Sequence, residues 1–222
     1  LTAAELQQHT RCPRSSLNLL LRGLVELGYF TFHTKTASYF PSARFDRLGN
    51  WILPTVLQDG AVGRLLDELR ESTHETVILS MRSDLDMEVV RVATSHQAIS
   101  LNIQCGYRFP IWLTAVGQAA LSTLTSTELA RLYRRGSPPD HLSLNDVKRT
   151  VSRVRDAGYA TGYGTVLERV GAIAAPLPVT FSGRELVLSL GGPEERVRPR
   201  EKHLAETLSE CITAFCEALE PD

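Results

Sequence analysis

The feature that most constrains the fold is a change of hydrophobic period near Gly28. Before it, apolar residues recur every three or four positions, which is the spacing of one helix face. After it, from Tyr29 to Phe40, phenylalanines alternate with polar residues, which predicts a short β-hairpin turning at 34–38. A glycine at the junction is a typical helix stop. The residues expected on the buried stripe of the helix are Leu17, Leu20, Leu21, Leu24 and Val25.

A shorter helix is expected before this one. Thr2 suits an N-cap, and Glu5 follows at the spacing of a capping box. This helix should end near Thr10, and Pro13 should be the first residue of the second helix, because a proline lacks the N–H that is unpaired there. Two helices joined by a tight turn, here followed by a hairpin, are typical of a helix-turn-helix module.

The face opposite the leucine stripe is basic and polar. In a helix-turn-helix the second helix enters the major groove, where Arg reads guanine and Asn reads adenine, while hydroxyls and lysines hold phosphates. Any amphipathic pair of helices also presents a polar outer face, so that plainer interpretation stays open. The residues predicted to contact double-stranded DNA are Arg14, Ser15, Ser16, Asn18, Arg22 and Lys35.

A connecting helix is expected at 43–53, where Phe45, Leu48 and Ile52 share one face and Pro54 follows. We therefore predict three parts: a DNA-binding domain at 1–42, a linker helix at 43–54 and a second domain at 55–222. The apolar face of the linker predicts a dimer contact, although packing against the hairpin would also bury it.

The second domain alternates groups of strands with helices, which predicts an α+β fold. The helix from Ser143 has Asp146 as a capping-box partner and Gly158 as its stop. The segment Gly162-Tyr163-Gly164 is expected to be a turn. Helices are expected at 56–73, 114–123, 126–134 and from Pro199, with Leu204, Leu208, Ile212, Phe215 and Leu219 inward, and strands at 76–81, 86–92, 99–103, 172–179 and 185–190.

Composition excludes several classes of protein. The hydrophobic fraction of 43% and the charged fraction of 22% are ordinary for globular domains. No apolar run is long enough for a membrane span, the four cysteines form no CxxC pair, and the histidines lack metal-ligand spacing. G-x-S-x-G, P-loop and H-E-x-x-H motifs are absent from the sequence. We expect a soluble, cytoplasmic protein that is not an enzyme and has no metal or cofactor.

The whole chain resembles the IclR-type transcriptional regulators, and the segment 89–96 further resembles their branch for aromatic-acid catabolism. Leu19 stands where that family usually has a DNA-contacting arginine, Trp112 replaces a usual histidine, and Gly164-Thr165 replace a common acidic pair. The family also has a helix before the first one here, so we expect the chain to be truncated at its N-terminus. The matching stretches are Leu1–Phe30, Gly106–Pro110, Thr114–Leu121, Gly158–Ala160, Ile173–Pro176 and Gly191–Pro193.

This resemblance implies a partial winged helix-turn-helix, entered at its second helix. It also implies a GAF/PAS-like effector-binding domain with a mainly antiparallel sheet flanked by helices, and a homodimer or homotetramer on DNA. The implied function is regulation of a catabolic operon by a small organic carboxylate, such as an aromatic one. The alternative is a small-molecule sensor or enzyme whose N-terminal helices mediate assembly. The resemblance assigns the effector pocket to Leu101, Ala115, Val116, Gly162, Ala172, Ser189, Leu190 and Gly191, to which Thr114 adds a hydroxyl and Arg91 a positive charge if its strand faces inward.

Overall fold

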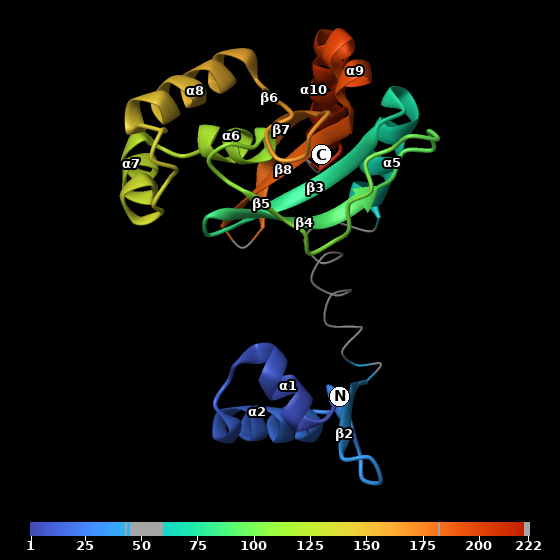
Figure 1. Ribbon diagram of the computed structural model, residues 1–222. Helices are drawn as coiled ribbons and strands as arrows, with labels where there is room; N and C mark the ends of the chain where they lie inside the picture. The colour runs from blue at the N-terminus through green and yellow to red at the C-terminus, as the bar shows by residue number, and fades with distance from the viewer. Residues whose placement is uncertain (43, 45–59, 182, 220–222) are drawn as a thin grey trace. The chain divides into compact units, whose positions relative to one another are not determined.

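The computed structural model describes residues 1–42, 44, 60–181 and 183–219 (Figure 1). The chain divides into two units, Leu1–Gly60 and Ala61–Asp222, each of which is described by itself. The α+β class predicted from the sequence is confirmed. The helix and dimer contact predicted at 43–54 lie outside the described residues, apart from Arg44.

The N-terminal unit contains α1 (Ala3–Thr10), α2 (Arg14–Glu26) and a hairpin of β1 (Phe30–His33) and β2 (Ser38–Pro41). The predicted capping box is confirmed, because the Thr2 N–H donates to Glu5 Oε2 (2.7 Å) and the Glu5 N–H donates to Thr2 Oγ1 (3.3 Å). Pro13 is the N-cap of α2 and not its first residue, because its ψ of 137° is extended.

The buried stripe of α2 is narrower than predicted. Leu17 and Leu21 are buried, but Leu20 is 56% exposed. Leu24 and Val25 are half-buried, and α1 and β1 both pack against α2. Gly28 follows the helix with a φ of +73°, a conformation that favours glycine.

The C-terminal unit is built on a six-stranded antiparallel sheet with the order β5-β4-β3-β8-β7-β6. The two central strands, β3 and β8, lie far apart in the sequence and pair so that Ile78 is opposite Ser189. The strands are β3 (Thr76–Ser83), β4 (Asp86–Ala93), β5 (Arg108–Pro110), β6 (Ala160–Tyr163), β7 (Val170–Phe181) and β8 (Arg184–Pro193).

Helices cover both faces of this sheet, so β3 is buried without interruption from Thr76 to Ser80. On one face α6 packs in a cluster with Ile78 and Val187, and α5 and α10 pack on the other face (Figure 1). The helices are α5 (Ala61–Thr73), α6 (Ala115–Ser122), α7 (Ser126–Arg135), α8 (Leu144–Ala157), α9 (Glu194–Val197) and α10 (Glu201–Glu217), with a 3-10 turn, η1 (Arg198–Arg200), before α10.

Local signals in this unit were predicted correctly. The capping box of Ser143 and Asp146 begins α8, and Gly158 ends it with a φ of +80°. The side chains expected on the inner face of α10 are buried, except that Leu219, beyond its end, is half-buried. No helix in the described part of the chain is long and apolar enough to cross a membrane.

Three predicted elements were wrong. The segment 99–103 is a loop and not a strand, because side chains and not a neighbouring strand bond its carbonyls at Ile99 and Leu101. Gly162 and Tyr163 lie in β6 and not in a turn. The last helix begins at Glu201, because Pro199 lies in η1.

Candidate effector cavity and DNA-binding face

A cavity in the C-terminal unit lies between the sheet, the start of α6 and two loops. The cavity volume is about 50 Å³. This is several times the minimum volume that holds one water molecule. Nine of the ten residues predicted for the effector pocket lie in its wall: Leu101, Thr114, Ala115, Val116, Gly162, Ala172, Ser189, Leu190 and Gly191.

Sequence reasoning missed other parts of the wall. Ile78 could have been found by pairing the central strands, because it lies opposite Ser189. Phe109 lies on the short strand that was not predicted. The loop after β6 contributes Thr165, Val166 and Leu167, for which the sequence offers no periodic signal.

Arg91, the tenth predicted residue, is exposed and does not line the cavity. Met87 and Val89 face the cavity side, so simple alternation would place Arg91 there too. The register of β4 against β3 shifts next to Val90, which reverses the alternation. Val92 therefore packs on the cavity side, and the guanidinium of Arg91 lies near Gly63 of α5. Arg91 was predicted to supply a positive charge only if its side chain faced the cavity, and it faces the other side of the sheet.

The polar groups of the cavity are few and mostly engaged. Thr114 caps α6, accepting from the Gly117 N–H (3.0 Å) and donating to the Pro110 carbonyl (2.8 Å), so its hydroxyl proton is already bonded. Ser189 Oγ makes a longer bond to the Ile78 carbonyl (3.3 Å), which a ligand could replace. Both hydroxyl groups therefore already have a hydrogen-bond partner within the protein.

The start of α6 offers better donors. The N–H groups of Ala115 and Val116 belong to its first turn and have no acceptor within the helix. A Cβ added to Gly162 would lie 3.4 Å from the Ala115 nitrogen, so glycine at 162 leaves that N–H uncovered. Such a helix start favours an anion.

The chemistry of this wall suits binding and not catalysis. Its described side chains are mostly apolar, none of them is charged, and none forms a nucleophile–base pair. Within the described residues no group of His, Cys, Asp and Glu side chains could hold a metal ion. An apolar ring with one carboxylate, placed at the start of α6, fits this arrangement.

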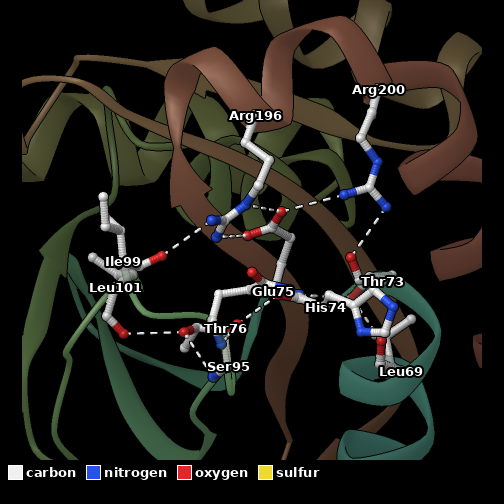
Figure 2. Close-up of polar contacts among 11 residues, drawn as sticks. Leu69, Thr73, His74, Glu75, Thr76, Ser95, Ile99, Leu101, Arg196 and Arg200 are labelled. Carbon is white, nitrogen blue, oxygen red and sulfur yellow. Dashed lines mark hydrogen bonds and ion pairs between the residues drawn. The ribbon is translucent and has the colours of Figure 1, made fainter.

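Figure 2 shows a buried ion pair beside the loop that carries Leu101, a residue of the cavity wall. Glu75 is fully buried, and its carboxylate accepts two hydrogen bonds from Arg196, at 2.7 and 2.6 Å, and one from Arg200 at 3.4 Å. Hydrogen bonding to Glu75 raises the pKa of Arg196, which keeps the guanidinium charged. A Cβ on Gly192 would lie 2.2 Å from Glu75 Oε2, so only glycine fits there. Sequence reasoning missed this pair because its members are far apart in the chain.

The predicted DNA-binding residues lie in the N-terminal unit. Arg14, Asn18 and Arg22 follow one another at four-residue intervals along one side of α2. Asn18 is half-buried, and the other five predicted residues are exposed. Leu19, on the outer face of the same helix, is 75% exposed.

Comparison with known proteins identifies the family. The family model described as "Bacterial transcriptional regulator IclR C-terminal" matches residues 60–217, which is most of the chain. The chain belongs to the IclR family of transcriptional regulators. Because this is a family of regulators and not of enzymes, the enzymatic alternative is excluded.

Relatives of known name agree with this assignment. The chain is 27% identical over 183 residues to the Pca regulon regulatory protein of Pseudomonas putida, covering 80% of this chain and 62% of that protein's length. It is 23% identical to the HTH-type transcriptional regulator KdgR of Escherichia coli, covering 95% and 81% of the two chains. An IclR-family regulator from Brucella abortus has the same fold, with a TM-score of 0.73, 23% identity and coverage of 99% and 85%.

Proposed function

We propose that this IclR-family protein is a DNA-binding regulator of a catabolic operon, acting in the cytoplasm, and that it responds to a small aromatic carboxylate. One observation carries the proposal: an apolar cavity whose wall includes Ala115 and Val116, the first residues of α6, whose N–H groups have no acceptor within the helix. The relative from Pseudomonas putida is named for a regulon, which supports a role at an operon.

In this proposal the cavity recognises two parts of the effector. The ring packs against apolar walls such as Ile78 and Val116, and the carboxylate accepts hydrogen bonds from the N–H groups of Ala115 and Val116. An effector changes DNA binding only if its affinity differs between the two DNA-binding states of the protein. The experiment that tests the effector half is a calorimetric titration with benzoate of the protein and of variants at the start of α6.

The DNA half of the proposal predicts different effects for two basic residues. Arg14→Ala should weaken binding to a preferred duplex by about 1–3 kcal/mol and relax its base preference, because this side chain is proposed to reach a guanine. Lys35→Ala should weaken all duplexes alike and lower the salt dependence, because it is proposed to hold a phosphate. Fluorescence anisotropy with duplexes selected from a random pool measures both effects.

Lys202→Ala removes an exposed lysine from the C-terminal unit and is the matched control for charge. It should leave DNA affinity unchanged. An unchanged affinity and base preference for Arg14→Ala would show that this arginine does not read a base.

We also propose a homodimer or homotetramer, because one module reads too few bases for useful specificity. If the segment 43–54 contributes a dimer contact, a chain beginning after Pro54 should form an assembly with fewer subunits than the 222-residue chain does. Sedimentation velocity over a range of concentrations measures this. The same number of subunits in both chains would rule out that contact.

A further inference from the structure

A second hollow adjoins the cavity and shares two of its wall residues, Leu101 and Val170. Its volume is about 320 Å³, whereas the volume of the cavity is about 50 Å³. Ile99 on its rim is 73% exposed, so this outer hollow opens to solvent. A molecule in solution can therefore reach the far side of Leu101 without any change in the protein.

Leu101 stands at the boundary between the two spaces. It is half-buried, and its Cδ2 atom would lie 2.6 Å from a Cβ on Gly191, so its side chain packs directly on the backbone of β8. Along β8, Gly191 lines the inner cavity and Gly192 lines the outer hollow. The Leu101 side chain thus forms a partition across the edge of the strand.

Two side chains hold the loop that carries Leu101 (Figure 2). Thr76 Oγ1 donates to the Leu101 carbonyl (3.0 Å), and Arg196 Nη1 donates to the Ile99 carbonyl (3.1 Å). The other two hydrogen-bonding nitrogens of Arg196 are held by the buried carboxylate of Glu75. The planar guanidinium therefore joins a fixed point in the core to the loop, which a single ammonium group cannot do with the same geometry.

We propose that Arg196, fixed by Glu75, is a positioning residue that holds Leu101 as the partition, and that small molecules enter the cavity from the outer hollow when Leu101 swings aside. The proposal deepens the effector-binding function proposed above and rests on it. Apart from Leu101 and the loop after β6, the wall is formed mainly by the sheet and α6, whose regular backbone hydrogen bonds make them open less readily than a loop. The competing route is the loop after β6, where Val166 is 39% exposed.

The test measures access to the cavity without any effector. Ser189→Cys places a thiol in the wall of the cavity at a residue that is 2% exposed. The probe is 4,4′-dithiodipyridine, a small aromatic disulfide that modifies thiols. The tryptic peptide that begins at Glu185 contains none of the four native cysteines, so mass spectrometry follows this site alone. The rate of modification scales with the fraction of molecules in which the cavity is open.

Three variants in the Ser189→Cys background give the expected pattern. Leu101→Ala removes the partition and should raise the rate at least about tenfold. Arg196→Lys keeps a positive charge beside Glu75 but loses the bridge to Ile99, and should raise the rate about three- to tenfold. The double variant should match Leu101→Ala alone, because positioning has no effect once the partition is gone.

Matched controls separate gating from general loosening. Arg149→Lys changes an exposed arginine that pairs with Asp146 on α8, away from both spaces, and should not change the rate. Val166→Ala shortens the side chain on the competing route, and it too should leave the rate unchanged. A thiol placed by Ser122→Cys is buried at the end of α6 and outside the cavity, so it should react at the same rate with and without the Arg196→Lys change.

Each remaining outcome contradicts the proposal. Equal acceleration at Ser122→Cys and Ser189→Cys would mean that Arg196→Lys loosens the whole domain. Acceleration by Val166→Ala without acceleration by Leu101→Ala would place the entrance at the other loop. The thiol probe is not an effector, so the rates of thiol modification test the entry route independently of the proposed function. A benzoate titration that shows no binding would contradict the proposed function and would leave the result on the entry route unchanged.

Discussion

Arg196→Met is expected to lower the free energy of unfolding of the C-terminal unit by about 3 kcal/mol, because it leaves the buried carboxylate of Glu75 without its main partner. Arg200 remains 3.4 Å from Glu75 Oε1, so the expected loss lies at the low end of the range for a broken buried pair. Urea unfolding followed by circular dichroism measures the loss as a lower midpoint with an unchanged slope.

Two further variants test the cause of that loss. Arg149→Met removes an exposed arginine of α8 whose surface pair with Asp146 contributes at most about 1 kcal/mol. Glu75→Leu combined with Arg196→Met removes both charges and should recover most of the lost stability, because no unpaired carboxylate stays buried. If the double variant is as unstable as the sum of the two single ones, lost packing and not the unpaired charge causes the effect.

The features predicted correctly from the sequence depend on residues close together in the chain. The capping boxes at Thr2 and Ser143 and the helix stop at Gly158 each involve a hydrogen bond or a backbone conformation within about one helical turn. The walls of the cavity were assigned through resemblance to the family, and nine of those residues lie together in the structure. The resemblance to the family thus predicted which distant segments meet in space, and hydrophobic periodicity alone does not predict this.

The features that were missed depend on the pairing of distant segments. Arg91 follows the alternation of β4 in the sequence, but a register shift against β3 turns it to the other face. The loop at 99–103 has the apolar pattern of a strand, yet Thr76 and Arg196 bond its carbonyls in place of a neighbouring strand. Nothing local to the loop or to Glu75 indicates that these residues meet.

Ala115→Trp is expected to weaken benzoate binding at least about 100-fold, because an indole at the start of α6 fills a cavity of only about 50 Å³. Isothermal titration calorimetry measures the affinity, and DNA binding without benzoate should persist, since Ala115 belongs to the C-terminal unit. Ala157→Trp, at the exposed end of α8, is the matched control and should bind benzoate normally. Equal affinity in the Ala115→Trp variant would place the effector site elsewhere.

Because a buried tryptophan can also disturb folding, Gly162→Ala gives an independent test of the same site. Its new methyl group would lie 3.4 Å from the Ala115 nitrogen and 3.2 Å from Thr165 Oγ1, close enough to cover the N–H without displacing backbone. Benzoate should then bind about tenfold more weakly, whereas toluene, which has the ring but no carboxylate, should bind with unchanged affinity. Gly63→Ala adds the same methyl group on α5, where its nearest neighbour is the Arg91 guanidinium at 3.5 Å, and should change neither affinity. Equal losses for benzoate and toluene in the Gly162→Ala variant would mean that the methyl group fills the cavity, and that the start of α6 does not bind the carboxylate.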